Sequence, residues 1–210
     1  MCEAFSALRS GLSCLESAES HEEDDAQLHW LYLEAGMRCR YSFLLAANAL
    51  LLSLETNRAL YDDFEKLPTL LKFEVVCMAL GKKLDRGNNL YSKIKEIVKC
   101  RNEFVHPKPR RANGRLAQDG KDFEIVVART KSCDYPTYFS LLEPKHTVNA
   151  VGDILKFLSW ILFDICEYSV KEGAMLLGIG SLSKTGDITI LANKYGFDTR
   201  TFDEDAEQHL

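Results

Sequence analysis

The sequence lacks the cysteine patterns that define disulfide-rich secreted domains and zinc sites. Its seven cysteines are odd in number, scattered along the chain and never arranged as Cys-x-x-Cys. This distribution is typical of reduced thiols in a cytoplasmic protein. Residues 178–187, GIGSLSKTGD, also lack the GxxxxGK[ST] order of a phosphate-binding loop. We therefore predict no metal and no cofactor, and we assign no ligand role to the isolated residues His21, His29, His146 and His209.

Long apolar runs are also missing. The longest, YSFLLAANALLLSL over residues 41–54, is interrupted by two serines and an asparagine, and it is shorter than the roughly 20 residues of a membrane-spanning helix. The N-terminal MCEAFSALRSGL has no charged region followed by an apolar one, so we expect no secretion signal. With 46% hydrophobic residues in 210, we predict a cytoplasmic globular protein with a substantial core and no membrane segment.

Charge of one sign is not in large excess, but its distribution is uneven. The net charge is −5, which argues against a protein that binds nucleic acid over its whole surface. Between Lys93 and Arg115, however, eight Lys and Arg residues are accompanied by only two Glu, a local charge of +6. Such a patch attracts phosphate, and a solvated basic loop after a helix end would give the same excess. Charge alone leaves both interpretations open.

The hydrophobic periodicity predicts a mainly α protein, an antiparallel helical bundle. We expect helices over about 3–19, 27–55, 68–80, 90–105 and 148–177. Gly81 is a natural stop for the third, and Asn88 or Asn89 a cap for the fourth. The last has apolar residues on two sides, so we expect it to be covered twice, by the N-terminal helix or by a second copy of the chain.

Three regions follow from this pattern. Residues 1–20 form an N-terminal helical extension, 21–177 the bundle domain, and 178–210 a C-terminal appendage that is partly disordered. Within the bundle, PKPRRANGRLAQDG over 107–120 predicts a mobile basic loop. The segments 123–129 and 137–143 flank DYP and indicate a small β-hairpin insertion, with an irregular loop as the alternative.

One arginine occupies an unusual position in IVKCRNEFVHP, residues 97–107. At 100° per residue, Arg101 falls in the middle of an apolar helix face that includes Leu90, Ile94 and Ile97. Its guanidinium stays charged, so burial there requires a partner. One interpretation is an ion pair with a carboxylate of a neighbouring helix, with Glu34, Glu74 and Asp164 as candidates. The other is that this face lines a cleft.

The residues around Arg101 could carry chemistry. Pro107 disfavours helical geometry at the preceding residue, so the helix should end near Val105 and leave His106 free to turn back toward Arg101. Asn102 lies one helical turn before His106. An arginine, an amide and an imidazole at one helix end can hold and cleave a phosphodiester. The alternative for His106 is a helix-terminal residue that binds backbone carbonyls.

The pattern Arg101-Asn102-x-x-x-His106 resembles the RNxxxH motif of the HEPN superfamily, and the order of helices over roughly 27–177 is similar to that family. The resemblance implies an α-helical bundle of HEPN type, usually a homodimer, in which two motifs meet in a cleft between protomers. It also implies a metal-independent endoribonuclease of the kind found in toxin–antitoxin and other defence systems. His106 would then be the general acid or base, Arg101 would stabilise charge on phosphate, and Asn102 would orient its neighbours.

The resemblance implies RNA as the partner, captured along its backbone by the basic residues Lys99, Lys108, Arg110, Arg111 and Arg115. An antitoxin protein is a further expected partner for a toxin of this family. Toxins paired with a nucleotidyltransferase antitoxin carry a tyrosine two residues after the histidine, where this chain has Lys108. Neutralisation by modification of that tyrosine is therefore not expected. The alternative function is a non-catalytic HEPN scaffold or a nucleotide- or protein-binding regulatory module.

Overall fold

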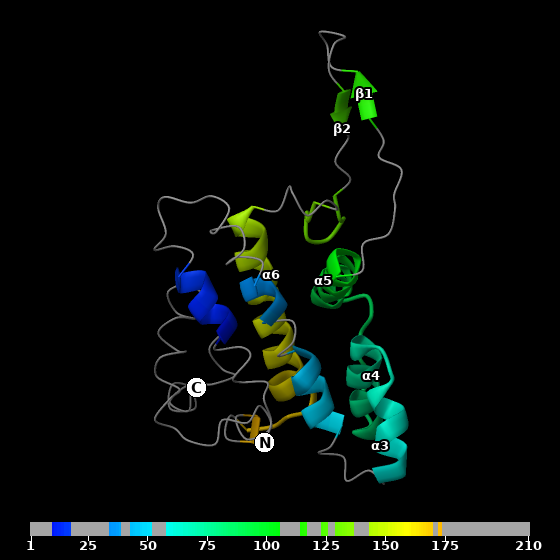
Figure 1. Cartoon of the computed structure of the whole chain (residues 1–210). Coiled ribbons are helices and arrows are strands. Elements are labelled where there is room, and N and C mark those ends of the chain that lie inside the picture. The colour runs from blue at the N-terminus through cyan, green and yellow to red at the C-terminus, as the bar shows by residue number, and fades with distance from the viewer. Residues whose placement is uncertain are drawn as a thin grey trace.

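The structure is a computed structural model, and it describes residues 10–17, 34–38, 43–51, 58–105, 114–116, 123–125, 129–136, 143–169 and 172–173. These residues are mainly helical, as the sequence predicted (Figure 1). Residues 10–17, 34–38 and 43–51 are helical. They are followed by α3 (Arg58–Glu65), α4 (Thr69–Ala79), α5 (Asn89–Val105), α6 (Pro144–Ser159) and the π-helical turn η2 (Trp160–Ile165). Among the described helices, none is both long and apolar enough to cross a lipid bilayer.

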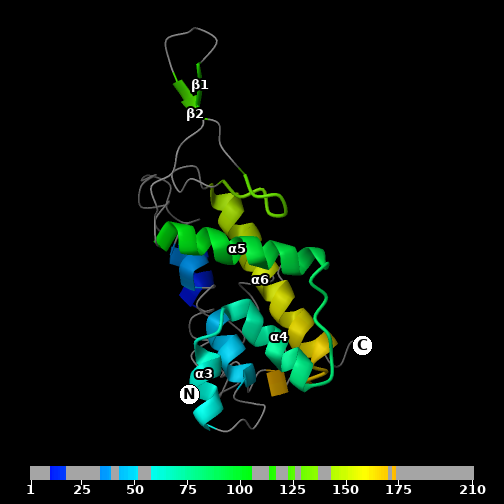
Figure 2. The ribbon, with the colours of Figure 1, turned by 90° about the vertical axis from the view of Figure 1, so that its right-hand side faces the viewer.

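The core lies between α6 and the helices around it. Figure 2 shows α5 running across α6, with α3 and α4 on one side of that crossing. An aromatic cluster joins three elements, because the ring of Phe157 on α6 lies 5.4 Å from those of both Phe43 and Phe73. Leu12 and Leu15 are fully buried in the same core. Residues on both sides of α6 are therefore buried within one chain. The sequence predicted a helix covered twice, but it left open whether the second cover was the N-terminal helix or a second copy.

Local signals set the ends of α4 and the start of α5. Pro68 precedes the first residue of α4. At its other end Gly81 has a φ of +69°, and the N–H groups of Gly81 and Lys82 donate to the carbonyls of Met78 and Cys77 at 3.0 and 2.8 Å. This is a Schellman ending, which requires the left-handed conformation that glycine adopts freely. Asn88 caps α5 by accepting the N–H of Leu90 at 2.8 Å.

The longer predicted helices differ from those observed. Of the segment predicted over 3–19, residues 10–17 are helical, and of 27–55, residues 34–38 and 43–51 are helical. Helix α3 was not predicted, although Tyr61 and Phe64 have helical spacing. We predicted a basic loop over 107–120, but within it Gly114–Leu116 form the strand β1. The other residues of this range lie outside the described residues.

Strand pairing also differs from expectation. The segment predicted as a strand over 123–129 contains β2 (Phe123–Ile125), which pairs antiparallel with β1. Residues 137–142 of the predicted partner lie outside the described residues. Arg129, the last residue of the first segment, forms an isolated antiparallel bridge with Pro136 of DYP. Both views show β1 and β2 extending beyond the helical part of the molecule.

The helix predicted over 148–177 begins earlier and ends sooner. It begins at Pro144 because Glu143 and His146 form a capping box, in which the Glu143 N–H donates to His146 Nδ1 at 2.9 Å. Its last turn is the π-helical η2, closed by the Cys166 N–H and the Ile161 carbonyl at 2.9 Å. Glu167 then has a φ of +58°, which ends the helix. The predicted appendage 178–210 lies outside the described residues.

Candidate functional site

Arg101 lies near the C-terminal end of α5, on its buried side. Ile97 and Ile94, one and two turns earlier, are fully buried, whereas Arg101 is half-buried. Arg101 lines a pocket of about 140 Å³ together with Asn102 and Thr69. The rest of the lining is mainly aliphatic and aromatic and includes Phe43, Leu44, Ile94, Ile97, Val98 and Ile154. The pocket thus brings α5 together with α4, α6 and the helical residues 34–38 and 43–51.

Two of the carboxylates considered as partners for Arg101 bind other residues. Glu34 binds Arg38, and Glu74 binds Arg86 and the hydroxyl of Tyr91. Within the described part of the chain, the guanidinium hydrogen-bonds only Asn102, with 3.1 Å between Nη1 and Oδ1. Among the described residues, Arg101 therefore lines the pocket and bonds its neighbour Asn102, and neither Glu34 nor Glu74 is its partner.

The rest of the predicted constellation is described only in part. Asn102 is exposed and holds Arg101, and Lys99 is exposed on the same helix, 4.0 Å from Glu103. Arg115 belongs to β1, where only the backbone is described. His106, Lys108, Arg110 and Arg111 lie outside the described residues. The structure brings Arg101 and Asn102 together and leaves the position of His106 untested.

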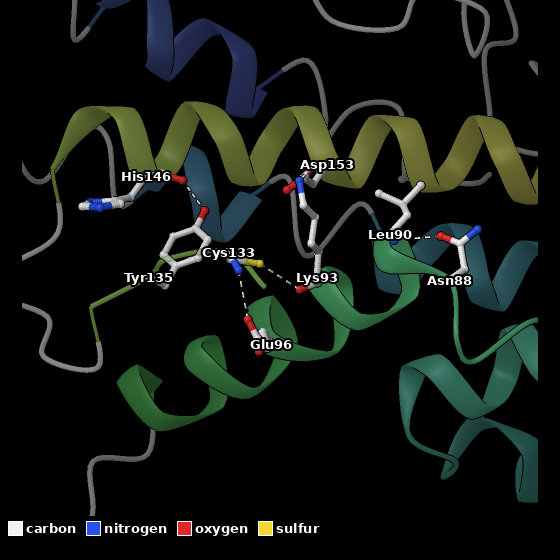
Figure 3. A network of polar contacts seen from close by, with 8 residues as sticks. All are labelled: Asn88, Leu90, Lys93, Glu96, Cys133, Tyr135, His146 and Asp153. Atoms are coloured by element: carbon white, nitrogen blue, oxygen red, sulfur yellow. Dashed lines mark hydrogen bonds and ion pairs between the residues drawn. The ribbon is translucent and has the colours of Figure 1, made fainter. Parts of the chain in front are cut away.

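Part of the positive charge counted in the sequence is used inside the fold. Lys93 pairs with Asp153 of α6 at 3.0 Å, and the Asp153 carboxylate is 11% exposed (Figure 3). This half-buried pair fastens α5 to α6. Lys93 is therefore not available to capture phosphate as a free surface cation, whereas Lys95 and Lys99 on the same helix are exposed.

A second link fastens the turn 129–136 to α5. The Glu96 carboxylate accepts the backbone N–H groups of Lys131, Ser132 and Cys133 at 3.1, 2.8 and 3.1 Å. Burial acts to raise the pKa of Glu96, but the hydrogen bonds outweigh it, so the pKa lies below its ordinary value. Sequence reasoning missed this contact because it joins residues more than 30 positions apart. This contact holds residues 131–133 against α5.

Other reactive side chains near α5 have structural roles. The Cys133 thiol donates to the Lys93 carbonyl at 3.3 Å, and burial raises its pKa to about 12, so it stays protonated. The Tyr135 hydroxyl donates to the His146 carbonyl (Figure 3). Among the described residues, no group of three or more His, Cys, Asp and Glu side chains could hold a metal ion.

The arrangement can bind an anion beside an apolar surface. Arg101 supplies the guanidinium N–H donors that Asn102 does not take, and the adjoining apolar wall excludes water from one side of the charge. The resemblance to HEPN proteins rests on the motif residues and the order of helices around them. Comparisons of the chain with protein-family models, curated proteins and solved structures found no match.

Proposed function

We propose that this chain is a cytoplasmic HEPN-type endoribonuclease that cleaves RNA without a metal, as a toxin or defence enzyme. The observation that supports the proposal best is the position of Arg101. A guanidinium on the apolar side of α5 has no carboxylate partner in the described part of the chain and is oriented by the next residue of the motif. A phosphate of RNA would supply the missing counter-charge.

In this proposal the chemistry is divided among the three motif residues. His106 removes the proton from a ribose 2′-OH or returns a proton to the leaving oxygen, a contribution of about 10²- to 10⁴-fold. Arg101 stabilises the negative charge that develops on the phosphate, and Asn102 holds the guanidinium in place. Attack by the 2′-oxygen would leave a cyclic phosphate on one product and a free 5′-hydroxyl on the other. The site is proposed to be shared by two copies of the chain across a two-fold axis.

The central experiment is incubation of purified protein with mixed RNA in the presence of a chelator. We expect cleavage by the wild type, and its loss in Arg101→Ala and in His106→Ala. Lys95→Ala is the matched control, since it removes an exposed charge from the same helix. Equal cleavage by wild type and His106→Ala would remove His106 from the mechanism.

A second set of variants separates RNA capture from chemistry. Replacing Arg110, Arg111 and Arg115 together with Ala should weaken RNA binding and lower the slope of log affinity against log salt by about 2. Cleavage at saturating RNA should remain, because these residues are proposed to bind only the backbone. If this variant loses the chemical step as completely as His106→Ala, the division between capture and catalysis is wrong.

Assembly provides an independent check. A composite site requires a dimer, so light scattering should report twice the mass of one chain at working concentration. Two nearby guanidinium groups repel each other unless an anion lies between them, so sulfate should raise the melting temperature. A monomer whose melting temperature is insensitive to sulfate would contradict the shared cleft.

One observation favours the alternative, a non-catalytic HEPN module that binds a regulatory ligand. The lining beside Arg101 is largely apolar, as expected of a small-molecule site. A dimer that binds RNA or nucleotide but gives no cleavage products under any tested condition would support this function over the ribonuclease.

A further inference from the structure

The pocket beside Arg101 has a composition that its role in RNA cleavage does not require. Three aliphatic side chains, Ile94, Ile97 and Ile154, line it from two crossing helices, α5 and α6. The polar side chains in the lining are those of Arg101, Asn102 and Thr69. A phosphodiester backbone alone would gain little from the aliphatic part, because its charged oxygens seek hydrogen-bond donors.

The charged residue in the described lining of this pocket is the cation Arg101. Arg101 is half-buried, and among the described residues it contacts no carboxylate. Asn102 occupies one side of the guanidinium at 3.1 Å from Nη1, which restricts its rotation and leaves other N–H donors for a ligand. A charge next to an apolar wall is poorly solvated, so an anion placed there is bound more strongly than at an open surface.

Size restricts the ligand further. The pocket measures about 140 Å³, and an apolar protein cavity of about 150 Å³ holds one benzene ring. A planar carboxylate matches the fork of a guanidinium with two parallel hydrogen bonds, and its single charge is easier to desolvate beside aliphatic side chains than a phosphate dianion.

We propose that this pocket binds a small organic monocarboxylate, with an apolar body about the size of one ring against the three isoleucines and its carboxylate on Arg101. Binding itself does not depend on the proposed ribonuclease activity. Its consequence does, because a carboxylate on Arg101 would compete with RNA phosphate and inhibit cleavage. The pocket would then make RNA cleavage responsive to a free organic acid.

Methyl NMR of isotope-labelled isoleucine tests the proposal directly, with benzoate as the probe. Benzoate should shift the methyl signals of Ile94, Ile97 and Ile154 with a saturable, millimolar dependence, as expected for so small a ligand. Acetate lacks the apolar body and benzyl alcohol lacks the charge, and each should bind roughly 10-fold more weakly or worse at constant ionic strength. Acetate or benzyl alcohol binding as tightly as benzoate would overturn the proposal, as would benzoate without a saturable shift.

Variants locate the binding site. Arg101→Gln should weaken benzoate binding by roughly 10- to 100-fold, because it removes a charge-assisted pair. Val98→Phe should fill the pocket and abolish the shifts, and if it fails to fold, Arg101→Gln and the two control ligands suffice. Lys95→Gln makes the same charge change at an exposed position of α5 and should bind benzoate like the wild type. Equal affinity in Arg101→Gln and wild type would refute the role of Arg101.

The result is separable from the ribonuclease assay. Benzoate binding without RNA cleavage would support the proposed carboxylate pocket and contradict the proposed ribonuclease activity. Cleavage without benzoate binding would retain the enzyme and reject this inference. When both occur, benzoate should raise the apparent KM for RNA without changing kcat, and an unchanged KM at saturating benzoate would refute competition at Arg101.

Discussion

Removing the Glu96 carboxylate should be among the most destabilising single changes on α5. It accepts three backbone N–H groups from residues 131–133, each within 3.1 Å. A hydrogen bond to a charged group contributes about 1.5–3 kcal/mol, and water replaces part of it where the turn is exposed. We therefore expect Glu96→Ala to lower the free energy of unfolding by about 2–4 kcal/mol. Glu96→Gln keeps one acceptor oxygen and should lose about 1–2 kcal/mol.

Urea denaturation followed by circular dichroism measures this effect as a shift in midpoint at constant slope. Lys95→Ala is the control, because Lys95 is exposed on the neighbouring position, and it should change stability by less than about 0.5 kcal/mol. The pKa of Glu96 lies below its ordinary value of 4.5. The stabilisation should therefore be complete above about pH 4.5 and disappear as the pH falls through the lower, folded-state pKa. A Glu96→Ala variant as stable as the control would refute the reasoning.

Three further predictions concern the folded core and its caps. Burial lowers the pKa of His146 below its ordinary value of 6.5, and only the unprotonated Nδ1 can accept the Glu143 N–H. The stability that this hydrogen bond contributes should be complete above about pH 6.5 and be lost as the pH falls through the folded-state pKa of His146. If His146→Gln loses stability toward acid pH as steeply as the wild type, this prediction is wrong. Gly81→Ala should cost about 1–2 kcal/mol in urea denaturation, since φ is +69° and no atom lies within 4 Å of an added Cβ. An unchanged free energy of unfolding in Gly81→Ala would show that glycine is not required at this φ. Phe157→Ala should cost about 3–5 kcal/mol by the same assay, and a loss below about 1 kcal/mol would show that the aromatic cluster packs loosely.

Elements with local boundary signals were the ones that the sequence predicted well. Pro68 and Gly81 delimit α4, and Asn88 begins α5, because each acts through its own backbone or through a residue two positions away. The end of η2 has no such signal. Glu167 adopts a left-handed conformation without being glycine, and its carboxylate pairs with Lys82, which is distant in sequence. Tertiary contacts thus decide that boundary, and the prediction extended the helix too far.

The same distinction applies to the candidate site. Helical geometry alone placed Arg101 on the buried face of α5, and the structure confirms that Ile94 and Ile97 share this face. The opposite wall of the pocket comes from Phe43, Leu44 and Ile154, whose proximity depends on how the helices cross. No spacing within α5 encodes that crossing. The role of His106 remains a prediction.

The way the turn 129–136 is held on α5 bears on how this protein can vary. Helix α5 ends at Val105, and Ser132 bonds Glu96 about two and a half helical turns back along the same helix. Because both attachment points are on one helix, the length of the intervening segment affects the core mainly through the entropy of closing a loop, which grows only logarithmically. Insertions, deletions and exchanges of charge in this segment are therefore open to natural variation and to engineering, while the helix that carries Arg101 keeps its packing.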